Sequence, residues 1–180
     1  MTNSRFVRFS VVLAALALAG SCAHKPEAYA ERKKASAALE AKSGSSISGN
    51  ASFDQYGDDV VLTIAILGAT PGVHAVHIHQ NPDCSDAEAK SAGDHWNPEH
   101  AMHGQFDKKP FHLGDVGNIE VGSNGAGELK LTTPKWSIDS KKETDILHHS
   151  VVVHASADDL KTDPSGNSGG RQACGVINLK

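Results

Sequence analysis

Short runs of residues with a period of two, separated by turn signals, recur along most of this chain. In "ISGNASFD" the series from Ile47 to Phe53 alternates with the polar series from Ser48 to Asp54, and "DDVVLTIAILG" and "GVHAVHIH" follow. Further on, "NIEVGSNGAGELKLTT" places Asn124-Gly125 between two such runs, which is typical of a β-hairpin. With "SVVVHAS" and "ACGVINL" the chain has about seven or eight strand-like runs, which predict an all-β fold, an antiparallel barrel or sandwich.

Two long stretches, residues 81–116 and 158–172, do not fit as strands. Both are rich in Gly, Pro, Asp, Asn and Ser, and most histidines outside the strand-like runs lie in the first. Loops longer than about 12 residues in a compact domain are usually functional or disordered. We therefore expect two long functional loops, which metal binding would order.

The first 21 residues predict an export signal. Arg5 and Arg8 precede the apolar run "VVLAALALA", which is too short to span a bilayer as a permanent helix. The following "LAGSC" resembles the lipobox of bacterial lipoproteins, with Ala19 where that motif usually has Leu. It predicts lipidation of Cys22 and a membrane anchor in the periplasm or cell envelope. The alternative is soluble export, with cleavage after the A-x-A segment at residues 28–30.

The polar segment after this leader predicts a tether followed by one domain. Residues 22–34 are charged and carry no recognisable chemistry, so we expect them to be flexible. Residues 35–180 are long enough to bury a core as a single domain. The formal net charge is −4 and no stripe of Lys and Arg is interleaved with aromatic residues, so the composition argues against a nucleic-acid partner.

Export changes the interpretation of the cysteines, because thiols pair in an oxidising compartment. With Cys22 assigned to the leader junction, Cys84 and Cys174 predict one disulfide. It would close a loop of roughly 90 residues and contribute on the order of 4 kcal/mol to stability. The alternative is two reduced, buried cysteines.

Three histidines in "HAVHIH" are sorted by strand parity. His77 and His79 share a face, with attachment points about 6.6 Å apart, while Val76 and Ile78 point the other way into the core. His74 has the parity of Val76 and Ile78, so we interpret it as a structural histidine bonded to backbone or loop groups. The pair alone is a weak metal signal, but the chain offers further ligands downstream.

Those further residues carry a family resemblance over residues 35–180. The motifs "HAVHIH", "AGDHWNP", "HGQFDKKPFHLGDVGN", "VVVHASADDL" and "GNSGGRQACGVI" occur in the order found in Cu/Zn superoxide dismutases, and the chain resembles the bacterial exported kind. The resemblance implies a Greek-key barrel of about eight strands. It also implies copper ligands at His77, His79, His95 and His154, and zinc ligands at His95, His103, His112 and Asp115, with His95 bridging the two metals.

The same resemblance implies the reaction and its supporting residues. Two superoxide anions would be converted to dioxygen and hydrogen peroxide while copper cycles between Cu(II) and Cu(I), with His95 supplying a proton. Asp158 would link ligands His77 and His103, and Arg171 would attract the anion. Four imidazoles suit Cu(II), and three histidines with one carboxylate suit a structural Zn(II). Both monomers and homodimers are compatible with this family.

Three histidines depart from the family pattern. His100 is outside the family spacing and is expected to face solvent. His148 and His149 are expected in a surface turn, the alternative being an extra weak metal site.

A non-catalytic copper-binding or copper-delivery protein, the first rival function, would need neither the bridging histidine nor Arg171. A cupin-type iron site would need a Glu soon after the His pair, whereas "QNPD" follows it, and the hydrolase motifs H-E-x-x-H and G-x-S-x-G are absent.

Overall fold

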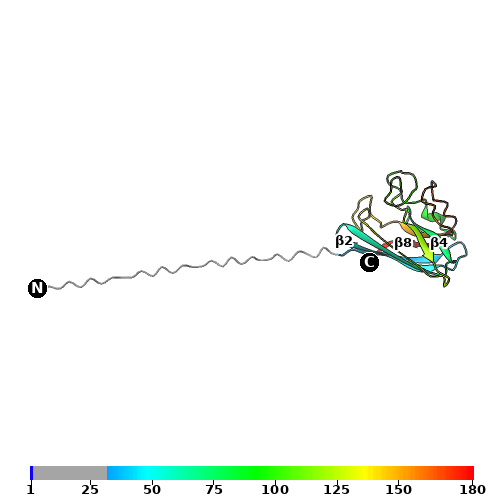
Figure 1. Cartoon of the computed structure of the whole chain (residues 1–180), viewed down its shortest axis with the longest axis horizontal. Helices are drawn as coiled ribbons and strands as arrows, with labels where there is room; N and C mark the ends of the chain where they lie inside the picture. Colours follow the sequence, from blue (N-terminus) through cyan, green and yellow to red (C-terminus); the bar gives the residue numbers. More distant parts are fainter. Residues whose placement is uncertain (2–31) are drawn as a thin grey trace.

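The computed structural model describes residue 1 and residues 32–180 (Figure 1). The predicted export signal, the lipidation site Cys22 and most of the predicted tether therefore lie outside the described residues. Within the described part, no helix is long and apolar enough to cross a membrane.

Nine strands form one antiparallel sheet that closes into a barrel. They are β1 (Lys34–Ala41), β2 (Ser48–Tyr56), β3 (Asp59–Leu67), β4 (Gly72–His79), β5 (Gly117–Val121), β6 (Gly127–Thr133), β7 (Ser150–His154), β8 (Arg171–Val176) and the short β9 (Asn178–Leu179). The order is β2-β3-β6-β5-β4-β7-β8-β1-β9, and pairing of β1 with β2 closes it. A single 3₁₀ turn, η1 (Lys90–Ala92), is the only helical element among the described residues.

The strand order is a Greek key. Consecutive strands β4, β5 and β6 form a meander, and β3 returns to lie beside β6. The hairpin around Asn124-Gly125 joins β5 to β6, with Val121 opposite Gly127 and Gly125 in the left-handed region at φ 75°. The predicted all-β Greek-key barrel is therefore confirmed, with eight main strands and with both predicted long loops in place.

The register of β4 separates core from site. Val76 and Ile78 point into the main hydrophobic cluster, where Phe53, Leu62 and Trp136 are also fully buried. Each such aliphatic side chain contributes about 1.5–3 kcal/mol when it leaves water. Because successive side chains alternate, His77 and His79 lie on the opposite face of the same strand, away from that cluster.

Two segments differ from the expectations. The strand β1 was not predicted individually, and it begins at Lys34, one residue inside the predicted tether. Its sequence "KASAALEA" is rich in residues that favour helices, yet Ala35, Ala37 and Leu39 alternate into the core. Residues 134–149 form a third long connection that the sequence analysis did not single out.

The disulfide between Cys84 and Cys174 is confirmed, with Cα atoms 5.7 Å apart. It joins the first long loop to β8, where a small apolar cluster of Ala89, Ala92 and Val152 packs beside it. Arg171 and Gln172, expected at the end of the second loop, belong to β8. The loop that carries His95, His103 and His112 is thus tied to the strand that presents Arg171.

Candidate metal centre

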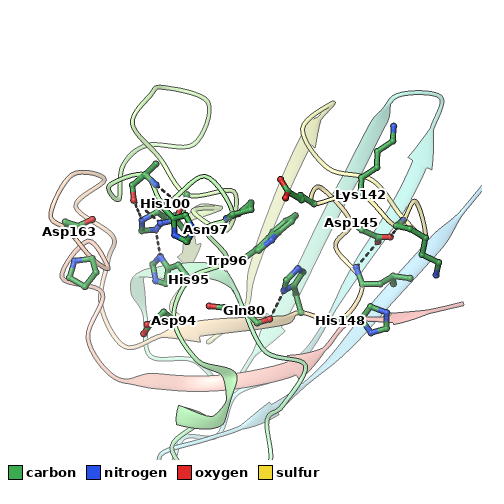
Figure 2. Close-up of a pocket in the computed structure, with 18 residues that line it drawn as sticks. Gln80, Asp94, His95, Trp96, Asn97, His100, Lys142, Asp145, His148 and Asp163 are labelled. Carbon is green, nitrogen blue, oxygen red and sulfur yellow. Dashed lines mark hydrogen bonds between the residues drawn. The ribbon is translucent and has the colours of Figure 1, made fainter.

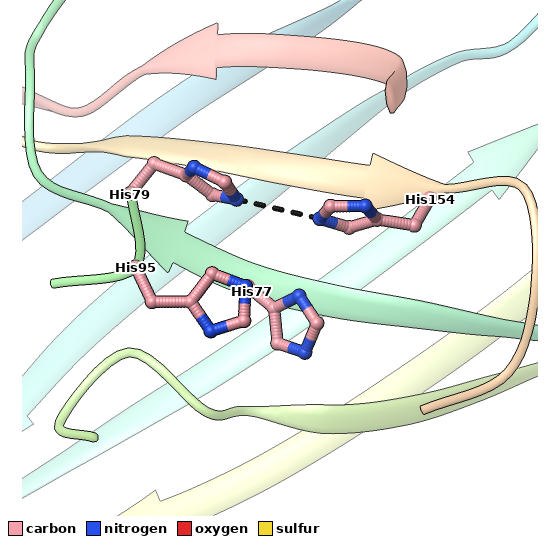
Figure 3. Close-up of side chains that lie close together, drawn as sticks. All are labelled: His77, His79, His95 and His154. Atoms are coloured by element: carbon pink, nitrogen blue, oxygen red, sulfur yellow. Dashed lines mark hydrogen bonds between the residues drawn. The ribbon is translucent and has the colours of Figure 1, made fainter. Parts of the chain in front are cut away.

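Four histidines converge on the outer face of β4 and β7. His77 and His79 come from β4, His154 ends β7, and His95 lies in the first long loop, where it forms an isolated bridge with His79. One nitrogen of each ring lies within 4.8 Å of the others, and all four residues are buried (Figure 3). The Nε2 atoms of His79 and His154 are 3.3 Å apart.

A second group shares His95 with the first. It contains His95, His103, His112 and Asp115, again with ligand atoms within 4.8 Å of one another. Asp115 Oδ1 lies 2.8 Å from His95 Nδ1, 3.0 Å from His103 Nδ1 and 3.1 Å from His112 Nδ1. The other oxygen, Oδ2, accepts the backbone N–H groups of Gly104 and His112 at 3.0 and 2.8 Å. The carboxylate of Asp115 is therefore held in place by backbone N–H groups of the first long loop.

His95 presents one ring nitrogen to each group. Its Nδ1 faces Asp115 and lies 3.4 Å from His112 Nδ1. Its Nε2 is buried and has no hydrogen-bond partner among the described residues. The rings of His95 and His77 lie with centroids 3.9 Å apart. This geometry is what a ring shared by two metal sites requires.

Three other ligand rings are oriented by backbone carbonyls. His79 Nδ1 lies 2.8 Å from the Gly93 carbonyl, His112 Nε2 lies 3.1 Å from that of Ala101, and His154 Nδ1 lies 3.2 Å from that of Gly169. A ring nitrogen that donates to a carbonyl leaves the other nitrogen with its lone pair free. In each case the free nitrogen is the one directed into its group.

The carboxylate of Asp158 connects the two groups. Its Oδ2 accepts from His77 Nε2 and its Oδ1 accepts from His103 Nε2, both at 2.9 Å. The backbone of Asp158 is in turn gripped by the Asn118 side chain through two hydrogen bonds of 2.8 and 2.9 Å. Asn118 was not predicted to belong to the site, although it is the last residue of the motif "HGQFDKKPFHLGDVGN".

Burial keeps most of these rings neutral. It lowers the pKa of His79 and His154 well below the ordinary value of 6.5, and the charge of Arg171 lowers both further. Burial also lowers the pKa of His77, against the hydrogen bond with Asp158. The pKa of His95 falls to about 4 by burial, against its hydrogen bond with Asp115. Neutral imidazole is the form that binds a metal.

His103 and its two carboxylates behave in the opposite way. Burial lowers the pKa of His103, but its hydrogen bonds with Asp115 and Asp158 outweigh this and raise it to about 9. Burial raises the pKa of both carboxyl groups, but hydrogen bonds with the surrounding histidines outweigh it and hold each pKa well below the usual range. Without a metal, a proton on His103 balances part of this buried negative charge.

The fork of Arg171 is held by the first long loop. Its Nη1 donates to the Ala89 carbonyl at 2.6 Å and its Nη2 to the Gly93 carbonyl at 2.7 Å. The Gly93 carbonyl also accepts from His79 Nδ1. One carbonyl thus connects the guanidinium with a ring of the first group, a role for Gly93 that the sequence analysis did not find.

The remaining histidines lie outside both groups. His74 has its two ring nitrogens 2.8 Å from the carbonyls of Thr70 and His154, which confirms its structural role. His100 is exposed, as expected. His148 is exposed, and His149 stacks on Trp96 with centroids 4.5 Å apart. Together with His100 they line a groove of about 830 Å³ beside His95 (Figure 2), but within residues 32–180 they join no cluster of three potential ligands.

The donor set fits copper and zinc. Two buried ring nitrogens of the all-histidine group have no hydrogen-bond partner in the described structure: His77 Nδ1 and His95 Nε2. An unpartnered buried polar atom is costly, so its presence at the centre of a ligand group indicates a metal. Four imidazoles suit copper, and three imidazoles with one carboxylate suit zinc.

Comparison with known proteins agrees with this geometry. Residues 47–177 match the family model described as copper/zinc superoxide dismutase. The chain is 36% identical over 158 residues to the "Extracellular superoxide dismutase [Cu-Zn]" of Onchocerca volvulus, covering 82% of this chain and 76% of that protein. It is also 36% identical over 144 residues to the "Superoxide dismutase [Cu-Zn]" of Deinococcus radiodurans, covering 73% and 77%.

A solved structure shares the fold. The crystal structure of the "clock protein EA4" matches with a TM-score of 0.74 and 33% identity, covering 84% of this chain and 98% of that one. The family model, the relatives and the two ligand groups lead to one conclusion: the chain belongs to the copper/zinc superoxide dismutase family and is an oxidoreductase of copper and zinc.

Proposed function

We propose that the two ligand groups divide the metals of this superoxide dismutase between them. Copper is held by His77, His79, His95 and His154, and zinc by His95, His103, His112 and Asp115. The observation that carries this assignment is that His95 turns Nδ1 to the group that contains Asp115 and the unpartnered Nε2 to the all-histidine group.

The protein's own groups prepare the site for conversion of superoxide to dioxygen and hydrogen peroxide. Bound copper supplies a one-electron couple between Cu(II) and Cu(I), and bound zinc supplies a fixed positive charge. His95 can hold a proton at Nε2, the atom that faces the all-histidine group, and give it to the reduced substrate. Asp158 fixes the rings of His77 and His103 from behind.

Arg171 is proposed to attract the anionic substrate. Two of its N–H groups are occupied by carbonyls, which fixes the plane of the guanidinium and leaves its remaining donors for an anion. Its Nη2 shares the Gly93 carbonyl with Nδ1 of His79. The guanidinium therefore lies beside the all-histidine group, where its charge can attract superoxide.

The test combines metal content with superoxide consumption in the purified full chain. We expect about one copper and one zinc per chain and rapid superoxide consumption. His95→Ala should lose zinc and most activity, Arg171→Ala should keep both metals and lose activity, and the exposed-loop control His100→Ala should match the parent. Full metal content without superoxide consumption in the parent would instead favour a non-catalytic copper-binding or copper-delivery protein.

We also propose that the chain is a bacterial exported protein, anchored by a lipid at Cys22. The leader of residues 1–21 and the "LAGSC" segment support this, and the Onchocerca volvulus relative is named extracellular. Mass spectrometry of the mature chain should find Cys22 as the first residue with acyl mass added. A mature chain that begins at Glu31 would contradict the anchor and favour soluble export. A homodimer, which the resemblance allows, is tested by sedimentation velocity of the same sample.

A further inference from the structure

Asp94 places an acidic side chain beside the proposed anion-attracting residue. It follows Gly93, whose carbonyl lies 2.7 Å from Arg171 Nη2, and it precedes His95. Since consecutive Cα atoms are about 3.8 Å apart, its carboxylate lies within roughly 10 Å of the guanidinium. Asp94 is exposed and lines the groove next to His95 (Figure 2).

The carboxylate of Asp94 stabilises no part of the fold among residues 32–180. No hydrogen bond or ion pair of its side chain occurs there, and only its backbone carbonyl is used, by the N–H of Gln80 at 2.9 Å. By contrast, the nearby Asp86 accepts the backbone N–H groups of Glu88 and Ser91 and so holds the turn before η1. Removing the charge of Asp94 should therefore leave the loop intact.

Acidic side chains near Arg171 oppose its positive field at the surface beside His95. Another cation of the same loop, Lys90, is paired with Glu88. Asp94 and Asp86 then remain as acidic neighbours of the guanidinium, and both favour its charged form against burial, which lowers its pKa. A protein of net charge −4 thus keeps acidic groups beside the one cation proposed to draw in an anion.

We propose that Asp94 limits the rate at which this superoxide dismutase captures its substrate, by partly cancelling the field of Arg171 beside His95 and the all-histidine group. The inference rests on the proposed role of Arg171. A unit charge about 7 Å from an anion in a water-like medium changes its local concentration roughly two- to fourfold. Asp94 therefore acts as a charge that tunes the rate and small-anion affinity, with no part in the chemistry.

The experiment measures kcat/KM for superoxide, per bound copper, in the full metal-loaded chain with Asp94→Asn. At an ionic strength of about 10 mM we expect an increase of roughly two- to fourfold over the parent. The gain should shrink toward none at about 0.5 M salt, where the Debye length is only a few ångströms. Asp94→Glu, which keeps the charge, should behave as the parent does.

Asp58→Asn is the matched control for the change in net charge. Asp58 is exposed in the turn between β2 and β3. This turn lies beyond the Lys34 end of β1, where Lys34 pairs with Asp54 of β2. Arg171 lies near the opposite end of β1, where Ala41 pairs with Ala173. The length of β1 places this turn about 25 Å or more from Arg171. We expect Asp58→Asn to change kcat/KM by far less than Asp94→Asn does.

Azide affinity gives a readout that is separate from turnover. Azide is a small monoanion, and its binding to copper is measured by absorption. Asp94→Asn should raise azide affinity at low salt by the same factor as kcat/KM. Equal values for Asp94→Asn and Asp58→Asn in both assays would overturn the inference, as would a gain that persists at high salt. If the metal-loaded parent itself fails to consume superoxide, the proposed function fails instead.

Discussion

Gly166 lies directly against the carboxylate of Asp158: a β-carbon on Gly166 would fall 1.9 Å from Oδ1. The same atom would lie 2.7 Å from His103 Nε2, and Gly166 has a φ of 62°, in the region that favours glycine. The hydrogen bond that joins Asp158 to His103 is thus covered by a residue that can carry no side chain.

Gly166→Ala should therefore displace Asp158 and loosen both ligand groups. We expect zinc affinity to fall about 10- to 100-fold, the range seen when a partner behind a ligand is lost. Competition with a chromophoric chelator measures it. Gly170→Ala in the same loop is the control, because nothing lies within 4 Å of the added carbon. Equal zinc affinity in the two variants would show that the cover over Asp158 does not matter.

The disulfide should couple stability to the position of Arg171. Cys174 lies three residues after Arg171, and Cys84 begins the loop whose Ala89 and Gly93 carbonyls hold the guanidinium. Replacing both cysteines by serine should lower the free energy of unfolding by about 4 kcal/mol. Activity per bound copper and metal retention should fall together in this variant. The same joint loss is expected in the parent after chemical reduction of the disulfide. Unchanged activity per copper and unchanged metal affinity would refute the coupling.

Local sequence patterns predicted the parts of the site that depend on strand parity. His77 and His79 fall on one face and Val76 and Ile78 on the other because a strand alternates its side chains, and this needs no knowledge of distant residues. The strand-like composition of β7 likewise placed His154 at a strand end. The ordered family motifs predicted the rest of the ligand set, which the fold brings into two buried groups.

Contacts between distant backbone atoms could not be predicted in this way. The shared carbonyl of Gly93 and the two-sided grip of Asn118 on Asp158 depend on how loops fold over the barrel. Strand β1 escaped prediction because its Ala, Lys and Glu residues favour a helix, and pairing with β2 and β8 overrides that preference. Such tertiary contacts leave no local periodicity to detect.

Asp145 organises the connection of residues 134–149 through its carboxylate. Its two oxygens accept four backbone N–H groups, from Asp139, Ser140, Lys141 and Leu147, at 2.7 to 3.1 Å. Asp145→Asn should lower the free energy of unfolding by about 1–3 kcal/mol, measured by urea denaturation, because an amide cannot accept at both positions. Zinc and copper affinity should change little, since β7 is held by β4 and β8. A large loss of metal would contradict this independence.

Zinc uptake by the metal-free protein should release protons. With a pKa of about 9, His103 is protonated at pH 7, whereas His95, with a pKa of about 4, is not. Zinc must displace the proton from His103, so we expect about one proton released per zinc at pH 7, measured by titration calorimetry in buffers of different ionisation heat. Apparent zinc affinity should rise with pH and level off above about pH 9.

The same shift sets the pH dependence of the metal-free fold. The pKa of His103 is raised on folding, so its contribution to stability is fully present below the unfolded value of 6.5 and is lost as pH rises through about 9. Urea denaturation of the metal-free chain between pH 6 and 10 should show this decline, and the zinc-loaded chain, whose His103 is neutral with the metal at Nδ1 and its one proton at Nε2, should lack it. No proton release at pH 7 together with a flat profile would contradict the charged state of His103.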